Sequence, residues 1–327
     1  MHVNTILVTG GAGSIGTSLI SKLVDKCDKL IVLDNFSSSL SNDLINSSKI
    51  ELVSGDICND EVLEHVFSNK INHVYHLAAN FANQNSVNYP EKDLMTNGMG
   101  TLKLLKFCVQ NNVEKFLLSS SSCVYQPTDA PFAEDSPLAL TTPYAITKLL
   151  SEHYVSFYNK FYNLPAVIVR YFNSYGPYTR PGKFRGVVPN FLSQAVKGEP
   201  ITITGTGDET RPFTYVEDIV DGTILAMENG CGDTYAYSAH PPHTDESLVY
   251  NIGNERSVKI KYLAKLINET CGNKSEIKYL PKRDWDVIPN RSVDATRAKE
   301  KFGFKTKYSL EEGIKKTYEW YKENGVV

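Results

Sequence analysis

The stretch TILVTGGAGSIG, residues 5–16, joins a short apolar run to the start of an amphipathic one. Thr5–Thr9 predicts a buried strand, and Ser14–Lys26 predicts a helix with its apolar residues on one face. The glycines between them permit a tight turn and let the backbone approach a pyrophosphate, which the N–H groups at the start of a helix attract. The stretch fits both GxGxxG and GxxGxxG, so we expect a dinucleotide-binding turn.

A carboxylate strengthens this interpretation. Asp34 ends a second predicted strand, Leu30–Asp34, and lies 21 residues after Gly13. A carboxylate at this place binds the hydroxyls of the adenosine ribose and repels a 2′-phosphate. All eight arginines of the chain follow residue 169, so no arginine lies near Asp34 in the sequence that could bind a 2′-phosphate. We therefore expect NAD rather than NADP as the cofactor.

Strands and helices alternate through the first half of the chain. Further strands are predicted at Ile50–Val53, His73–Ala78, Phe116–Ser119 and Ala166–Arg170, and helices at Glu61–Phe67, Asp93–Gln110 and Pro143–Asn163. Strands that are apolar throughout indicate a parallel sheet covered on both faces. We expect an α/β fold, a Rossmann-type doubly wound parallel sheet over residues 1–175 that binds the cofactor.

The alternation changes after Pro177. Residues 176–327 are expected to form a smaller C-terminal α/β domain that binds the substrate, with some segments packing back on the first domain. Helices are predicted at Pro189–Lys197, Val216–Glu228, Val258–Cys271, Asp294–Phe302 and Ser309–Asn324, and strands at Ile201–Ile203 and Tyr250–Ile252. The polar stretch Cys231–Leu248 predicts a loop of unassigned role.

Composition excludes several classes of protein. The chain has 327 residues, of which 22% are charged, and a formal net charge of −3, so no basic field for nucleic acid or an anionic membrane is expected. No apolar run reaches the roughly 20 residues of a membrane span, and we expect no signal peptide. Six scattered cysteines without a CxxC predict reduced thiols, no metal site and a cytoplasmic location.

Three further residues predict proton-transfer chemistry. Tyr144 and Lys148 are four residues apart on a predicted helix, so their side chains share one face. A neighbouring ammonium and a positively charged nicotinamide favour the phenolate of Tyr144, which can then act as a base. Ser121 belongs to the run of four serines that ends the fifth strand, where open α/β sheets place ligand groups.

At these motifs the chain resembles the extended short-chain dehydrogenase/reductase family, in its NAD-dependent nucleotide-sugar epimerase/dehydratase group (UDP-glucose 4-epimerase-like). The resemblance implies Tyr144, Lys148 and Ser121 as catalytic residues, and a substrate that carries a nucleotide diphosphate. Implied cofactor contacts are Gly10, Gly13, Ser14, Ile15, Gly16, Asp34, Asn35, Asp56, Ile57, Leu77, Ala78, Ala79, Asn97, Ser119, Tyr144, Lys148 and Phe172. Implied substrate contacts are Ser121, Ser122, Asn173, Val188, Arg211, Arg283 and Arg291.

The resemblance also implies a homodimer, formed through the helices Asp93–Gln110 and Pro143–Asn163. The face between two copies should be apolar. Candidate residues for it are Leu102, Leu105, Phe157 and Phe161.

The residues that follow Ser121 bear on the reaction. Dehydratases of this group carry Asp-Glu after the catalytic residue, and decarboxylases usually carry a Glu nearby, whereas this chain has Ser122 and Cys123. We therefore expect a 4-epimerase on a UDP-hexose, which oxidises C4 and then reduces it from the other face. Two alternatives stay open: a C4 dehydrogenase that releases a keto-sugar, possibly GDP-linked, and a non-catalytic NAD-binding regulatory protein. The intact Ser121, Tyr144 and Lys148 argue against the latter.

Overall fold

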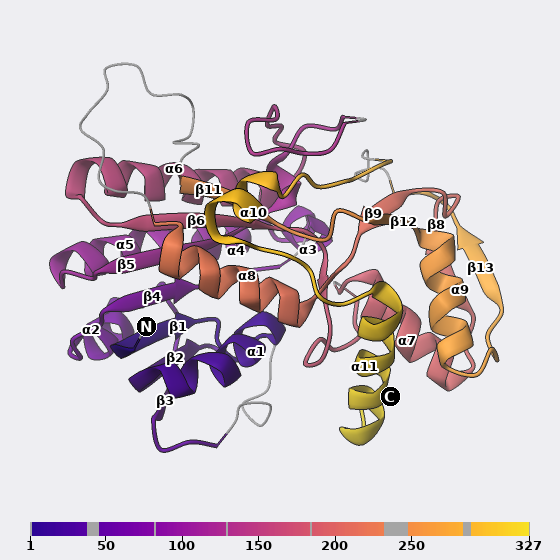
Figure 1. Ribbon diagram of the computed structural model, residues 1–327, viewed down its shortest axis with the longest axis horizontal. Coiled ribbons are helices and arrows are strands. Elements are labelled where there is room, and N and C mark those ends of the chain that lie inside the picture. Colours follow the sequence, from indigo (N-terminus) through magenta and orange to yellow (C-terminus); the bar gives the residue numbers. More distant parts are fainter. Residues whose placement is uncertain are drawn as a thin grey trace.

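Seven parallel strands form one sheet in the computed structural model (Figure 1). The structure describes residues 2–37, 46–81, 83–128, 130–183, 185–231, 248–283 and 289–326. The strands are β1 (Val3–Thr9), β2 (Cys27–Asp34), β3 (Ile50–Ser54), β4 (His73–His76), β5 (Lys115–Ser121), β6 (Ala166–Tyr171) and β11 (Val249–Ile252), in the order β11-β6-β5-β4-β1-β2-β3. The chain runs outward from β1 to β3 and returns to the other side of β1 at β4, which confirms the doubly wound fold. In such a sheet, ligands bind outside the carboxyl ends of the strands at this reversal.

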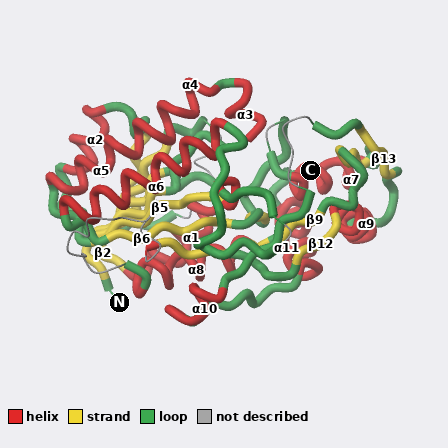
Figure 2. The backbone as a smooth tube through the Cα atoms, turned by 90° about the horizontal axis from the view of Figure 1, so that it is seen from above, coloured by secondary structure: helices red, strands yellow, loops and turns green. Residues whose placement is uncertain are grey.

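Helices cover both faces of the sheet (Figure 2). One layer contains α2 (Asp60–Phe67), α5 (Thr101–Gln110) and α6 (Pro143–Tyr162), and the other contains α1 (Ser14–Leu23), α8 (Val216–Asn229) and α10 (Thr296–Phe302). Because side chains alternate along a strand, Ile6 and Val8 of β1 join one apolar core while Leu7, between them, joins the other. Burial on both faces explains why these strands are apolar throughout.

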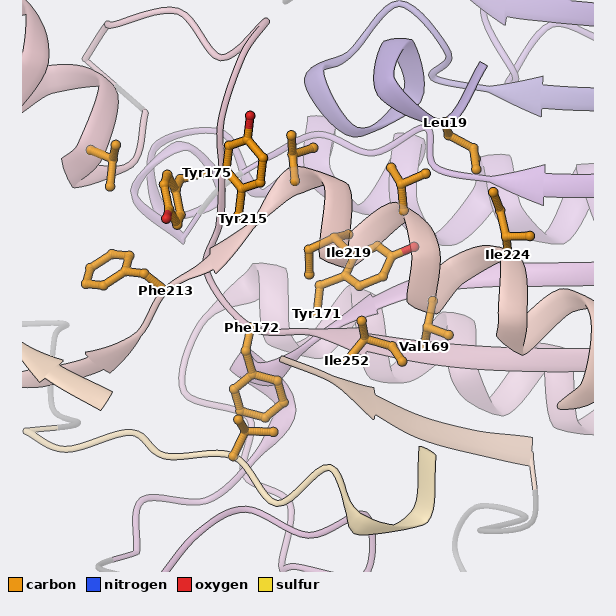
Figure 3. Packing of buried hydrophobic residues seen from close by; sticks show 14 of the residues in the cluster. Leu19, Val169, Tyr171, Phe172, Tyr175, Phe213, Tyr215, Ile219, Ile224 and Ile252 are labelled. Carbon is orange, nitrogen blue, oxygen red and sulfur yellow. The ribbon is translucent and has the colours of Figure 1, made fainter. Parts of the chain in front are cut away.

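Part of the second half of the chain packs on this sheet. β11 pairs with β6 as the seventh strand, and α8 contacts both α1 and α10. Figure 3 shows Ile219 of α8 gathered with Val169 of β6 and Ile252 of β11.

The smaller lobe is built on α7 (Val187–Lys197), α9 (Ile260–Thr270) and α11 (Leu310–Glu323), with the parallel pair β8 (Ile201–Thr204) and β13 (Ile277–Leu280) (Figure 1). Two further short strand pairs lie outside the large sheet. β9 (Thr210–Pro212) is antiparallel to β12 (Ser257–Lys259), and β7 (Ser174–Tyr175) is parallel to β10 (Thr214–Tyr215). The helix expected from Val258 begins only at Ile260, because Ser257–Lys259 pairs with β9. We did not predict β7, β9, β10, β12 or β13.

Two predicted helices differ from the structure by three residues at one end. The helix expected over Asp93–Gln110 begins at Pro90 and includes a π-helical segment, Leu94–Gly100, between α4 (Pro90–Asp93) and α5. The helix expected to end at Lys26 ends at Leu23 and continues as a 3₁₀ turn, Val24–Lys26. A further short helix, α3 (Asn83–Asn88), follows β4.

None of the helices in the described part of the chain is both long enough and apolar enough to cross a membrane.

Candidate active site

A cleft of about 940 Å³ opens at the carboxyl ends of the strands and extends toward the smaller lobe. The loops after β1, β2, β4 and β5 line one end of it, and residues of α7, β9 and the segments around Arg283 and Arg291 line the other. This volume lies at the upper end of the range for ligand pockets. The cleft is therefore large enough for two ligands that meet, such as a dinucleotide and a substrate.

The glycine turn after β1 provides a cradle for an anion. Gly10 has a φ of +68°, and a Cβ at this residue would lie 2.6 Å from the backbone of Ala78. A Cβ at Gly16 would lie 2.6 Å from the carbonyl oxygen of Gly10. α1 begins directly behind this turn, and its N-cap residue, Gly13, has no side chain that could cap the first N–H groups. The turn fits the pyrophosphate of a dinucleotide, with Gly13, Ser14 and Ile15 lining the same wall.

The ends of β2 and β3 supply two carboxylates. Asp34 accepts hydrogen bonds from the backbone N–H groups of Ala12, at 3.0 Å, and Phe36, at 2.8 Å. Asp56 accepts a hydrogen bond from the side chain of Asn35 at 2.9 Å. Burial raises the pKa of Asp56, but the N–H of Cys58 and the Asn35 amide outweigh it and lower that pKa overall. Both carboxylates line the cleft together with Asn35 and Ile57, which fits the ribose and adenine of the cofactor.

Leu77, Ala78 and Ala79 also line the cleft, in the loop after β4. The predicted strand ends at His76, two residues early. The ring of His76 lies between the hydroxyls of Thr9 and Thr101, and burial lowers its pKa to about 3. His76 is therefore a neutral structural bridge.

Two residues that were expected to contact the cofactor, Asn97 and Phe172, do not line the cleft. Asn97 is buried, and its side-chain oxygen accepts the N–H of Asn80, which does line the cleft. The side chain of Phe172 does not line the cleft: it is fully buried against Tyr125 and Phe132, with ring centroids 6.1 and 6.4 Å away. The resemblance implied Phe172 as a cofactor contact, but its side chain turns into the apolar core.

The predicted catalytic residues meet at the end of β5. Tyr144 lies in the first turn of α6, where the side chain of Thr142 caps the helix, and Lys148 lies one turn later. The ammonium of Lys148 donates to the carbonyl oxygen of Ser119 at 2.9 Å and lies 5.8 Å from the Tyr144 ring centroid. Ser121 ends β5 and lines the same part of the cleft.

Burial controls the protonation of this group. It raises the pKa of Tyr144 above its ordinary value, helped by Cys123 and Asp93 and opposed by the hydroxyl of Ser121. It lowers the pKa of Lys148 to about 8, against the attraction of nearby carboxylates. Tyr144 is thus a protonated phenol in the free protein, and a positive charge bound beside it would favour the phenolate.

All of the predicted substrate residues line the cleft, and they are Ser121, Ser122, Asn173, Val188, Arg211, Arg283 and Arg291. Asn173 adopts a φ of +40° and donates to the carbonyl oxygen of Pro212 at 3.1 Å. Arg211 donates to the carbonyl oxygens of Thr210 and Pro289, at 2.8 and 2.9 Å.

Sequence reasoning missed several lining residues. They include Asn80, Phe81, Asn83, Gln84, Lys92, Cys123, Lys183, Arg185, Gln194, Lys197 and Glu209. Lys183 and Arg185 lie in the stretch rich in Gly, Pro and Arg after β7, and that composition was a usable signal. Most of residues 231–248, the loop without an assigned role, fall outside the described residues. In the part of the chain that the structure describes, no three His, Cys, Asp or Glu side chains gather as metal ligands.

Comparisons with known proteins agree with this geometry. The model of the NAD dependent epimerase/dehydratase family matches residues 6–238. An epimerase structure from Methanothermobacter thermautotrophicus superposes with a TM-score of 0.91 and 39% identity, over 99% of this chain and 94% of that one. The UDP-glucose 4-epimerase of Thermotoga maritima, solved with UDP-glucose, gives 0.89 and 34%, over 98% and 99%. A UDP-N-acetyl-alpha-D-glucosaminuronate decarboxylase of Bacillus cytotoxicus is 32% identical over 97% of both chains.

Proposed function

Because the chain belongs to the NAD-dependent epimerase/dehydratase family, whose members act on nucleotide sugars, we propose that it is a 4-epimerase of a UDP-hexose. One observation carries this choice: Ser122 and Cys123 follow Ser121, so no carboxylate stands directly after the catalytic serine. The acidic residues in the described lining are Asp34, Asp56 and Glu209. The first two lie at the cofactor end, and Glu209 accepts the N–H groups of Gly207 and Thr206.

Elimination of water needs an acid that protonates the leaving hydroxyl and a base that removes a proton from carbon. Beside Ser121 the described lining offers Tyr144, which the oxidation at C4 already uses, and no carboxylate that could serve as a second acid or base. Epimerisation at C4 needs only one proton acceptor, because the same proton and hydride return to the sugar. The lining thus favours epimerisation over dehydration, and the resemblance to solved 4-epimerases supports the same choice.

Tyr144, Lys148 and Ser121 have different roles in this reaction. Tyr144, as the phenolate, takes the proton of the C4 hydroxyl and later returns it. Lys148, held by the Ser119 carbonyl, stabilises that phenolate with its charge. Ser121 orients the C4 oxygen from the end of β5. Bound NAD would supply the acceptor, and then the donor, of the C4 hydride. Burial of Tyr144 and Lys148 excludes water from the proton transfer.

The test uses purified protein without added NAD. UDP- and GDP-sugars are incubated in parallel and followed by proton NMR, and Tyr144→Phe is the matched variant. Conversion of a UDP-hexose to its C4 epimer, lost by at least about 1,000-fold in Tyr144→Phe with NAD still bound, supports the proposal. A lasting 340 nm absorbance without turnover would instead identify a C4 dehydrogenase.

We also propose that residues 1–175 hold the cofactor and residues 176–327 the nucleotide sugar, apart from the segments that pack back on the sheet. We also propose a homodimer formed through α6 and through the helix predicted over Asp93–Gln110, which ends in α5. Phe157 and Phe161 on α6 are 42% and 57% exposed, and their rings stack at 4.5 Å. Leu105 is wrong as a contact residue because it is fully buried in the core, and Leu102 is partly buried against that core.

A further inference from the structure

Asp93 is a buried carboxylate that the proposed reaction does not use. It ends α4, has no exposed surface and does not line the cleft. Burial of an ionised side chain is costly unless a partner compensates it. Among the described residues, none of the ion pairs includes Asp93. The carboxylate is held instead by hydrogen-bond donors from two other segments of the chain.

Two side chains donate to Asp93. The hydroxyl of Thr147 lies 2.5 Å from its Oδ2, and the amide nitrogen of Asn97 lies 3.1 Å from its Oδ1. The same amide lies 3.2 Å from the Thr147 hydroxyl oxygen, so the three side chains form a closed network. Burial raises the pKa of Asp93 overall, but the Thr147 hydroxyl and the charge of Lys148 oppose this rise. Donors at both oxygens favour the ionised form of the carboxyl group.

The network leads to the turn of α6 that carries the catalytic pair, Tyr144 and Lys148. Thr147 lies between them in the sequence, and its hydroxyl is 3.2 Å from the carbonyl oxygen of Tyr144. Burial is the largest influence on the pair, since it raises the pKa of Tyr144 and lowers that of Lys148 to about 8. The charge of Asp93 raises both pKa values. A carboxylate outside the cleft thus acts on both groups that handle the proton.

The other titratable groups that act on this pair are either neutral or paired. In the described part of the chain they are His76 on β4, Cys123 after β5, and Glu152 on α6. His76 is neutral, because burial lowers its pKa to about 3. Arg170 binds Glu152 through two hydrogen bonds, and Arg291 donates to the thiol of Cys123. None of the three therefore leaves an unpaired carboxylate beside the pair.

We propose that Asp93 is a positioning residue whose negative charge sets the pH range in which Tyr144 and Lys148 transfer the proton. The inference rests on the proposed role of Tyr144 as the proton acceptor. A nearby anion holds the proton on both groups, because loss of a proton from either makes the charge beside it more negative. Asp93 thus moves the working range of the pair toward higher pH. Thr147 fixes the place of this charge, since its hydroxyl contacts both Asp93 and the turn of α6.

Asp93→Asn tests the inference by removing the charge from a side chain of nearly the same shape. The hydroxyl of Thr147 can then donate to the Tyr144 carbonyl oxygen, 3.2 Å away, so the turn should keep its structure. Tyrosine absorbs differently as the phenol and as the phenolate. An ultraviolet difference titration between the NAD-loaded protein and its Tyr144→Phe variant therefore isolates Tyr144 from the other tyrosines. The same two proteins carrying Asp93→Asn should titrate with a midpoint about one pH unit lower.

Two control variants separate the effect of charge from that of structure. Thr147→Val removes the hydrogen bond to Asp93 and keeps the charge, and Asp60→Asn removes a carboxylate of α2 that is 61% exposed. Neither should move the midpoint by more than about 0.3 pH units, since solvent screens an exposed charge. An equal shift in Thr147→Val would mean that hydrogen bonding tunes Tyr144, and an unmoved midpoint in Asp93→Asn would mean that its charge has no effect. Either result overturns the inference.

A second variant covers a failure of Asp93→Asn to fold. Asp93→Ser also removes the charge, and it should lower the midpoint of the Tyr144 titration by a similar amount. Circular dichroism and NAD content show whether each variant is intact. Loss of folding or of NAD in both variants would mean that Asp93 serves the structure of this turn, and that result also overturns the inference.

Turnover separates failure of this inference from failure of the proposed function. In epimerisation of the UDP-hexose that the protein converts, both limbs of the pH profile of kcat should move to lower pH in Asp93→Asn. The maximum should fall by less than about threefold. A fall of more than about tenfold with unmoved limbs would identify a structural role and overturn the inference. Full turnover in Tyr144→Phe would instead overturn the proposed function, and the absorbance titration would still report the effect of Asp93 on Tyr144.

Discussion

Replacing Glu152 by Gln should destabilise the protein by breaking an ion pair beneath the catalytic residues. Glu152 and Arg170 are both fully buried, with Nε–Oε1 and Nη2–Oε2 distances of 3.0 and 2.6 Å. Glu152 lies on α6, one turn after Lys148, and also accepts the hydroxyl of Ser120 on β5. The pair thus ties α6 to β5 and β6, the elements that position Tyr144, Lys148 and Ser121.

The magnitude follows from burial. Removing one partner of a buried ion pair leaves the other charge uncompensated and costs about 3–5 kcal/mol. The glutamine carbonyl can still accept one hydrogen bond from Arg170, so we expect about 3 kcal/mol in the free energy of unfolding. At about 2 °C per kcal/mol for a chain of this size, Tm should fall by about 6 °C. The double variant Glu152→Leu with Arg170→Met should lose less than Glu152→Gln, because it leaves no buried charge.

Urea unfolding, followed by circular dichroism at fixed NAD concentration, measures these differences. Glu269→Gln is the control, since it breaks the exposed i,i+4 pair of Lys265 and Glu269 at 3.7 Å and should cost no more than about 0.5 kcal/mol. A loss below about 1 kcal/mol for Glu152→Gln would refute the reasoning. A double variant less stable than the single one would refute the view that the uncompensated charge is the cause.

Three further changes test other parts of the structure. Gly10→Ala should abolish co-purification of NAD, because φ is +68° and the new Cβ would lie 2.6 Å from backbone atoms, whereas Gly303→Ala, with a φ of +72° and open space, should retain it. Lys148→Met should stabilise the protein at pH 7 by up to roughly 3 kcal/mol, since burial lowers the Lys148 pKa from 10.5 to about 8 and so penalises the folded, charged form. That gain is fully present below pH 8 and should vanish as the pH rises to 10.5 in chemical denaturation; a constant difference would contradict it. Phe157→Asp combined with Phe161→Asp should halve the mass seen by light scattering, and an unchanged mass would exclude α6 from the dimer face.

Local signals explain which elements the sequence predicts well. α6 was expected over Pro143–Asn163 and spans Pro143–Tyr162, because each end is encoded in neighbouring residues. Thr142 caps its first turn, Pro143 suits the first helical position, and Asn163 closes the helix in the left-handed conformation at φ 53°. The glycine turn after β1 and the carboxylate at the end of β2 are likewise encoded by neighbouring residues. Both line the cleft.

Contacts between distant segments explain what the sequence does not reveal. β9 and β12 are three residues each and pair across more than 40 residues, so neither has a recognisable pattern of its own. Phe172 follows a strand that leads to the cleft, yet its ring packs with Tyr125 and Phe132 in the core. The contact of Cys123 with Arg291 spans 168 residues, and only the folded chain brings them together.

The buried basic side chains at the catalytic end differ in how their charge is balanced. In the described part of the chain the buried lysines and arginines are Lys148, Arg170 and Arg291. Arg170 has the carboxylate of Glu152, and Lys148 has the Ser119 carbonyl and the attraction of Asp93 and Glu152. The protein thus supplies carboxylates that offset the charges of Arg170 and Lys148. Of the three, Arg291 alone is paired with no described carboxylate, and its polar side-chain contact is the thiol of Cys123. Burial raises the pKa of that thiol, but the charge of Arg291 and hydrogen bonds outweigh burial and lower the pKa overall.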